Sequence, residues 1–353
     1  MNKPNVTIKM VAEASGVSTT TISRFLNGKY EYMSDETRKR IEQTVDEMGY
    51  RPSSIARSLK SKKTGLIGMV VADITSTFSS ILVKGINDAC QHADYQLIIS
   101  NTDSSLARER EYINSLIDRQ VEGLIINTVG GNDDFIREVV DAGMHVVAVD
   151  RTLADNFLDT VTTDNEKATK AMTELAYEAG FDKVVLFTKR LNNSSRIRRY
   201  HAFLEISQTY VEDPDQLVYV IPKEEEENGG YRRALERCLE EHKGSNLCIF
   251  TINGIVMINV LRELNALGLD IPDDIGICGY DDWDFTGIIG SGISVISQPS
   301  YEVGYKAGQL IVKRIYEDRK ISNPKYIELE SVLKQRGSTT LKTKSIDKSA
   351  VLV

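Results

Sequence analysis

The chain has 353 residues, enough for two or three domains, and its 41% hydrophobic and 27% charged residues are ordinary for a globular protein. Its start, MNKPNVTIKM, has no apolar leader, and no apolar run approaches the roughly 18 residues that span a bilayer. We therefore expect a cytoplasmic protein without membrane contact. The four cysteines lie far apart and form no CxxC pair, which favours buried thiols in a reducing cytosol.

Charge is divided unevenly along the chain. Residues 1–63 hold 12 Lys or Arg against 7 Asp or Glu, a net charge of +5, which leaves −13 for the rest of a chain whose total is −8. Phosphate neutralisation drives affinity for nucleic acids, so a basic head on an acidic body suggests that the head meets a polyanion.

Two short helices joined by a glycine-containing turn are predicted near the N-terminus. Apolar residues recur at helical spacing between residues 6 and 26, Thr7 can cap the first helix, and Ser18 can cap the second. Gly16 lies in the turn between them, where a positive φ is useful, and a third helix is expected over residues 34–49. This pattern predicts a helix-turn-helix unit, with an ordinary three-helix bundle as the alternative.

Side chains of the second helix suit contact with base edges. Thr19, Thr20 and Arg24 lie away from the apolar stripe of this helix. Arg24 can bond a guanine edge through two hydrogen bonds, and threonine methyls and hydroxyls suit thymine or phosphate. We expect the N-terminal side of this helix to enter the major groove of DNA.

The stretch AEASGVSTTTISRFLNG resembles the opening of the LacI/GalR family of bacterial transcriptional repressors, whose usual form is VAxxAGVSxxTVSRVLNG. The resemblance continues through SDETRKRIEQTVDEMGYRPSSIARSLKSKKTGLIG, and it implies a DNA-binding head at 1–51 with a hinge helix and linker at 52–63. The positions that it implies for contact with double-stranded operator DNA are Thr7, Ser18, Thr19, Thr20, Thr21, Ser23, Arg24, Asn27, Ser53, Ala56 and Leu59.

The linker carries a mechanism of its own. Pro52 can start a short helix that places Ile55, Ala56 and Leu59 on one face, too little apolar surface for a helix to be stable alone. In the family this helix forms when two linkers meet on DNA, and a leucine, here Leu59 by position, wedges into a minor-groove step. A flexible tether is the expected state of the same segment away from DNA.

From Thr64 onward apolar runs alternate with amphipathic segments, and the pattern restarts after Thr163. Such alternation predicts an α/β fold with two doubly wound lobes, each a parallel sheet covered on both faces. The body resembles the periplasmic sugar-binding fold that the family uses as its sensor, and crossings between lobes are expected near Thr163, Ile296 and Asn323. The expected core spans 64–340, with an N-lobe at 64–162 and 297–323, a C-lobe at 163–296 and 324–340, and a tail at 341–353.

Polar residues close most of the predicted strands, and ligands of such sheets bind at the carboxyl ends of strands. By resemblance Arg199 stands at the family's effector-clamping arginine, Asn253 at the asparagine of ANDxMA, and Asp281 at the first aspartate of GYDD. Trp283 can stack on a sugar ring, with core packing as the alternative. The residues expected to bind a small sugar-like effector are Phe78, Asn127, Asp150, Arg151, Arg196, Arg199, Asn253, Asp281 and Trp283.

The nature of the effector is approached through departures from the family pattern. The usual DISNPFF reads DITSTFSS here, and Gly254 replaces the aspartate of ANDxMA. Surplus arginines on one connection favour a sugar acid or sugar phosphate, with solvated or internally paired arginines as the alternative. They are Arg190, Arg196, Arg198 and Arg199. The segment DDWDFTGIIGSGISVISQPSYEVG resembles the ketogluconate and gluconate-type branch, and KEEEEN at 223–228 is expected to be a solvated bend.

The expected function is transcriptional regulation, with repression as the usual sense, by a homodimer whose operator affinity depends on the effector. The tail has no heptad series, so a tetramer is not expected, while induction and corepression stay open. An enzyme is disfavoured because GxSxG, P-loop, HExxH and GxGxxG motifs are missing, and no cofactor or metal is expected from four scattered histidines. A transport-associated binding protein would need export. A catabolite-type global regulator controlled by a phosphocarrier protein stays open.

Overall fold

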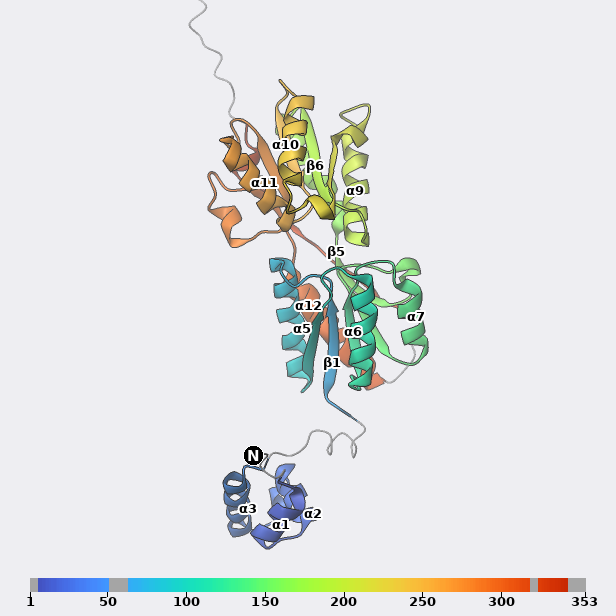
Figure 1. The fold of residues 1–353 in the computed structure, drawn as a ribbon, viewed down its shortest axis with the longest axis vertical. Coiled ribbons are helices and arrows are strands. Elements are labelled where there is room, and N and C mark those ends of the chain that lie inside the picture. Colours follow the sequence, from blue (N-terminus) through green and yellow to red (C-terminus); the bar gives the residue numbers. More distant parts are fainter. Residues whose placement is uncertain (1–5, 51–62, 318–322, 342–353) are drawn as a thin grey trace, which may run out of the picture. The chain divides into compact units, whose positions relative to one another are not determined.

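The computed structural model describes residues 6–50, 63–317 and 323–341, and the chain divides into two compact units, 1–64 and 65–353 (Figure 1). The predicted hinge helix, with Ser53, Ala56 and Leu59, lies outside the described residues, as does the tail beyond 341. Each unit is described by itself below.

The first unit contains the three predicted helices, α1 (Ile8–Ser15), α2 (Thr19–Leu26) and α3 (Asp35–Met48), with a short 3-10 turn, η1 (Tyr30–Tyr32), before α3. The helix-turn-helix prediction is confirmed. Gly16, between α1 and α2, has a φ of 65°, which a residue with a Cβ adopts only with strain. Val11, Ile22 and Ile41, one from each helix, are completely buried and form the centre of a small core.

The second unit begins with a six-stranded, wholly parallel sheet, the N-lobe, in the order β11-β5-β4-β3-β1-β2. Alternate residues of β1 face opposite sides: Met69 packs with α5 and α12, and Val70 packs with α6 and α7. The strands are β1 (Leu66–Val71), β2 (Gln96–Asn101), β3 (Gly123–Asn127), β4 (His145–Val149), β5 (Asp159–Thr163) and β11 (Tyr326–Leu329). The helices are α5 (Thr77–His92), α6 (Leu106–Asp118), α7 (Asp133–Asp141) and α12 (Ser300–Glu317).

The second sheet, the C-lobe, has the order β12-β10-β9-β8-β6-β7 and is parallel except for the β10–β12 pair. Its strands are β6 (Lys183–Lys189), β7 (Val218–Ile221), β8 (Leu247–Thr251), β9 (Gly276–Tyr280), β10 (Ser294–Ser297) and β12 (Val332–Lys334). Its helices are α8 (Asn165–Glu178), α9 (Ser194–Ser207), α10 (Gly230–Glu241) and α11 (Gly254–Leu267). The prediction of two parallel, doubly wound lobes is confirmed.

The chain passes between the lobes three times, and one crossing differs from the expectation. The first two follow Thr163 and Ser297, close to the expected places. The third lies between β11 and β12, at residues 330–331, rather than near Asn323. Residues 324–340 were expected wholly in the C-lobe, but β11 pairs with β5, and its Ile327 and Leu329 pack on the N-lobe core.

Helices α5 and α12 are in backbone contact. A Cβ added at Gly85 would lie 2.1 Å from the carbonyl oxygen of Tyr301, and one at Gly304 would lie 2.1 Å from that of Leu82. Neither separation is compatible with a side chain, so glycine at both positions allows the two helices to touch.

Candidate functional site

The exposed side of α2 presents the residues predicted to read DNA. Ile22 is buried in the head core, whereas Thr19, Thr20 and Arg24 are exposed. Neighbouring side chains are partly engaged within the head. Thr7 accepts a hydrogen bond from the amide of Met10 and caps α1, and Ser18 accepts one from the amide of Thr21 and caps α2.

The remaining predicted head residues hold the two ends of α2. The Thr21 hydroxyl lies 2.9 Å from the Ser18 hydroxyl, and Asn27 Nδ2 donates to the carbonyl oxygen of Ser23 at 2.6 Å. These bonds stabilise a helix of eight residues that would be marginal alone. The side chains that are left to reach a ligand are therefore those of Thr19, Thr20 and Arg24.

Tyr32 is a neighbour of Arg24 that the sequence reasoning missed. Its ring is 59% exposed, and the Arg24 guanidinium carbon lies 4.7 Å from its centroid. An arginine over an aromatic face is held by a cation–π interaction and loses less freedom when it binds. The aromatic residues of the turn between α2 and α3 were the available indication.

A cavity of about 870 Å³ lies at the carboxyl ends of strands from both lobes of the second unit. Eight of the nine predicted effector residues line it, and Trp283 does not. The eight are Phe78, Asn127, Asp150, Arg151, Arg196, Arg199, Asn253 and Asp281.

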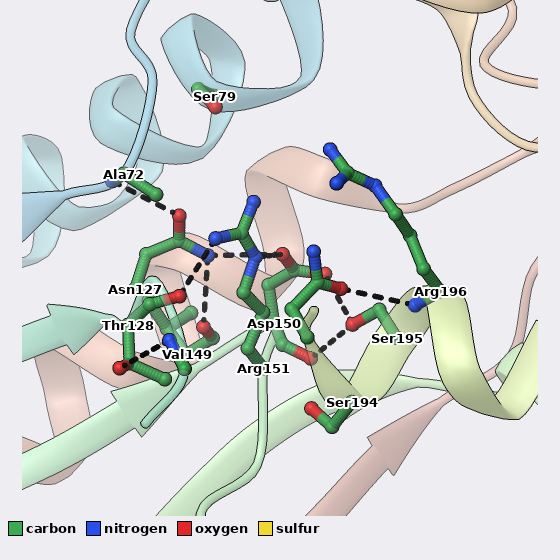
Figure 2. A network of polar contacts seen from close by, with 12 residues as sticks. Ala72, Ser79, Asn127, Thr128, Val149, Asp150, Arg151, Ser194, Ser195 and Arg196 are labelled. Carbon is green, nitrogen blue, oxygen red and sulfur yellow. Dashed lines mark hydrogen bonds and ion pairs between the residues drawn. The ribbon is translucent and has the colours of Figure 1, made fainter. Parts of the chain in front are cut away.

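The N-lobe wall of this cavity is a connected polar network (Figure 2). Asn127 Nδ2 donates to Asp150 Oδ2 at 2.9 Å, and Asn127 Oδ1 accepts from the amide of Ala72 at 3.3 Å. Arg151 Nη1 donates to the carbonyl oxygen of Thr128 at 2.7 Å, and its Nε lies 3.6 Å from Asp150 Oδ2. Burial lowers the pKa of Arg151, and the Asp150 carboxylate opposes this effect.

Arg199 joins three segments at the base of the C-lobe. Its guanidinium donates to Asn165 Oδ1 at 2.7 Å, to the carbonyl oxygen of Ile252 at 2.8 Å, and to Gln298 Oε1 at 2.9 Å. Its carbon also lies 3.5 Å from the ring centroid of Tyr280. Arg199 is therefore a structural hub of the C-lobe as well as a cavity residue.

Asp281 and Gln298 close the same end of the cavity. Asp281 Oδ2 accepts from the amide of Gly254 at 2.8 Å, and its Oδ1 accepts from Gln298 Nε2 at 2.7 Å. Burial raises the pKa of Asp281, although the Arg199 charge opposes this. Asn253 Oδ1 caps α11 by accepting from the amide of Val256. Gln298 was missed, although it follows a strand just as the predicted residues do.

Helix α9 also bridges the lobes beside the cavity. Ser195 Oγ donates to the carbonyl oxygen of Asp150 at 3.1 Å, a contact that joins the two lobes in Figure 2. Ser194 Oγ accepts from the amide of Thr152 at 2.7 Å. The helix that carries Arg196 and Arg199 is thereby tied to the N-lobe by its first turn.

Basic side chains gather on the C-lobe side of the cavity. Of the four crowded arginines, Arg190, Arg196 and Arg199 line the cavity, whereas Arg198 Nη1 donates to the hydroxyl of Tyr326 at 2.6 Å outside it. Lys189 and Lys223 add two further positive charges, and Lys189 is ion-paired with Glu226.

Arg196 has an unusual environment for a guanidinium. In Figure 2 its side chain extends away from the Asn127–Asp150 network. Its Nη1 donates to the carbonyl oxygen of Arg190 and to Asn192 Oδ1, and no carboxylate of the described residues lies within ion-pairing distance. Burial, followed by the nearby charges of Arg151 and Arg199, lowers the pKa of Arg196 to about 10.

Two expectations about surrounding residues need correction. The acidic segment 223–228 is not simply a solvated bend, because Glu224 and Glu226 line the cavity. Trp283 packs instead on the start of α11, where a Cβ at Gly254 would lie 2.5 Å from its ring. The absence of a side chain at position 254 thus creates the space that the indole fills.

Two further searches of the described residues gave negative results. None of the helices there has the length and apolar character to cross a membrane. No group of three or more His, Cys, Asp or Glu side chains in the same residues is placed to hold a metal ion.

Comparison with known proteins yields consistent matches along the chain. Residues 7–53 match the family described as bacterial regulatory proteins, lacI family, and residues 67–316 match the periplasmic binding protein domain. The HTH-type transcriptional regulator KdgR of Bacillus subtilis (strain 168) is 38% identical over 336 residues, which cover 95% of this chain and 98% of that protein. PtxS of Pseudomonas aeruginosa, also an HTH-type transcriptional regulator, is 34% identical and covers 96% and 97%.

Solved structures agree with these relatives. The lac repressor dimer bound to operator and the anti-inducer ONPF superposes with a TM-score of 0.80 at 21% identity, covering 96% of this chain and 100% of that one, which supports the fold. A LacI family regulator from Enterococcus faecium with bound ribose has a TM-score of 0.66 at 26% identity and covers 77% and 98%. The chain belongs to the lacI family of bacterial transcriptional regulators.

Proposed function

We propose that the protein binds double-stranded operator DNA through α2, and that a small polyhydroxylated acid in the cavity controls this binding. The exposed Thr19, Thr20 and Arg24 support the first part, together with the net charge of +5 on residues 1–63. The curated relatives KdgR and PtxS are named as transcriptional regulators. The cavity is proposed to bind without turnover, because both oxygens of Asp281 are occupied by protein donors.

The observation that carries the acid effector is the environment of Arg196. A guanidinium removed from water and without a carboxylate partner is costly, and its lowered pKa expresses that cost. A bound carboxylate would supply the missing counter-charge through charge-assisted hydrogen bonds. Asn127, Asp150 and Asn253 line the same cavity and suit the hydroxyls of the remainder of the ligand.

We also propose that two copies of the chain form the functional unit. The structural neighbour on operator DNA is described as a dimer. Here β2 is an edge strand whose Ile99 is 41% exposed, and α5 exposes Ile81 at 42%. Apolar side chains beside a free sheet edge suit pairing with a second copy. Two heads would then read two half-sites.

A thermal-shift series tests the effector. Gluconate and 2-ketogluconate are compared with sorbitol, which has similar hydroxyls and no charge. At a concentration 100-fold above Kd the acid should add about 2.7 kcal/mol, which corresponds to a Tm rise of about 5 °C or more. Arg196→Met should remove the rise for the acids. Equal stabilisation by sorbitol, or an undiminished rise in the variant, would refute the proposal.

The link to DNA is measured on the same preparation. Fluorescence anisotropy with an operator duplex and a scrambled duplex should show preference for the operator, and the stabilising acid should change that preference. A ligand shifts such an equilibrium only by its differential affinity for the two states, typically about 1–3 kcal/mol. An acid that binds without changing operator affinity would refute the control that we propose.

A further inference from the structure

The segment between β7 and α10 places one carboxylate inside the basic side of the cavity. Glu226 is ion-paired with Lys189, and their side chains are only 24% and 16% exposed. The preceding residue, Glu225, pairs instead with Arg233 on α10 and does not line the cavity. Two adjacent glutamates in one loop therefore have different surroundings.

The loop is held in this position by its own contacts. The amide of Glu225 donates to the carbonyl oxygen of Pro222 at 3.0 Å, and Asn228 Nδ2 donates to that of Glu224 at 2.8 Å. A Cβ added at Gly230 would lie 2.7 Å from the carbonyl oxygen of Glu225, so the start of α10 touches the loop. The placement of Glu226 is built into the fold.

Glu226 changes how much positive charge the cavity offers to a ligand. It neutralises Lys189 by direct pairing, and it is the carboxylate that most favours the charged form of Arg196. Arg196 nevertheless keeps no direct carboxylate partner among the described residues. One guanidinium is thus left for a single negative charge, while a second negative charge would have to compete with Glu226 for Lys189.

We propose that Glu226 is a tethered counter-ion that makes the cavity select carboxylate monoanions over phosphate dianions. This inference rests on the acid effector proposed above and narrows its class. An added negative charge near a partly buried carboxylate is repelled, and screening by salt weakens the repulsion only in part. The phosphate ester of a sugar therefore binds less tightly than the corresponding sugar acid.

The experiment measures Kd by isothermal titration calorimetry for the full-length wild type, Glu226→Gln and Glu225→Gln. The probes are gluconate, glucose 6-phosphate and sorbitol. Glu226→Gln should tighten glucose 6-phosphate about 10-fold or more and gluconate by a smaller factor, leaving sorbitol unchanged. Glu225→Gln removes the same charge from the same loop outside the cavity, and it should change none of the three values by more than about twofold.

Each other outcome has a definite meaning. Weaker gluconate binding by Glu226→Gln would make Glu226 a ligand of effector hydroxyls and overturn the counter-ion. Equal changes in both variants would reduce the effect to net charge and overturn it as well. A wild type that binds sorbitol but neither anion refutes the acid effector itself, whereas normal gluconate binding with no response to Glu226→Gln refutes only the counter-ion. Matching Tm values confirm that the variants are folded.

Discussion

Replacing Arg199 by methionine should destabilise the C-lobe severely. The substitution keeps an unbranched side chain but removes three hydrogen bonds, and two of the acceptors belong to Asn165 and Ile252, which are 2% and 0% exposed. Leaving a buried acceptor without its donor costs about 1–3 kcal/mol. The lost contact with the Tyr280 ring adds about 1–2 kcal/mol. We therefore expect a loss of about 3–5 kcal/mol, a large part of the usual stability of a domain.

Equilibrium unfolding in urea measures this loss through tryptophan fluorescence. The chain has one tryptophan, Trp283, which packs on α11 of the C-lobe, so its emission reports on the lobe that Arg199 holds together. Arg198→Met on the same helix is the matched control. Its guanidinium contacts the partly exposed Tyr326, and its loss should cost about 1 kcal/mol or less. Equal free energies of unfolding for the two variants would refute Arg199 as a hub.

Two further predictions concern the head and the thiols. Arg24→Ala should reduce the preference for operator over scrambled DNA by about 10- to 100-fold, measured by anisotropy with both duplexes, because a bidentate contact to guanine carries about 1–3 kcal/mol of discrimination. An unchanged ratio of affinities would contradict the assignment of α2. The four cysteines should be inert to a thiol reagent at pH 8 until urea is added, because all are buried and burial raises the pKa of Cys90 and of Cys238 to about 12. Rapid labelling of the native protein would show that the lobes open readily.

The sequence predicted those features that local patterns determine. Ser18 and Gly16 mark helix ends through their own backbone chemistry, so the head could be derived before any contact was known. Asn127 and Asp281 follow buried strands, and the topology of parallel sheets brings such positions together. The family resemblance then distinguished these residues from other polar strand ends.

The remaining site residues depend on contacts between distant segments. Glu226 reaches the cavity only because its loop rests on α10, and Trp283 turns away because position 254 offers it space. The pairing of β11 with β5 likewise depends on which core receives Ile327, a choice that alternation along a four-residue strand does not reveal. Such outcomes follow from packing rather than from local propensity.

The touching glycines of α5 and α12 determine how a tilt between the lobes is transmitted. Helix α12 starts directly after the crossing at Ser297, and its contact with α5 at Gly85 and Gly304 prevents one helix from sliding along the other. A rotation that begins at the crossing must therefore turn α12, α5 and the attached β1 as one stiff lever. Since β1 starts at Leu66, the end of that lever is the place where the chain leaves for the head.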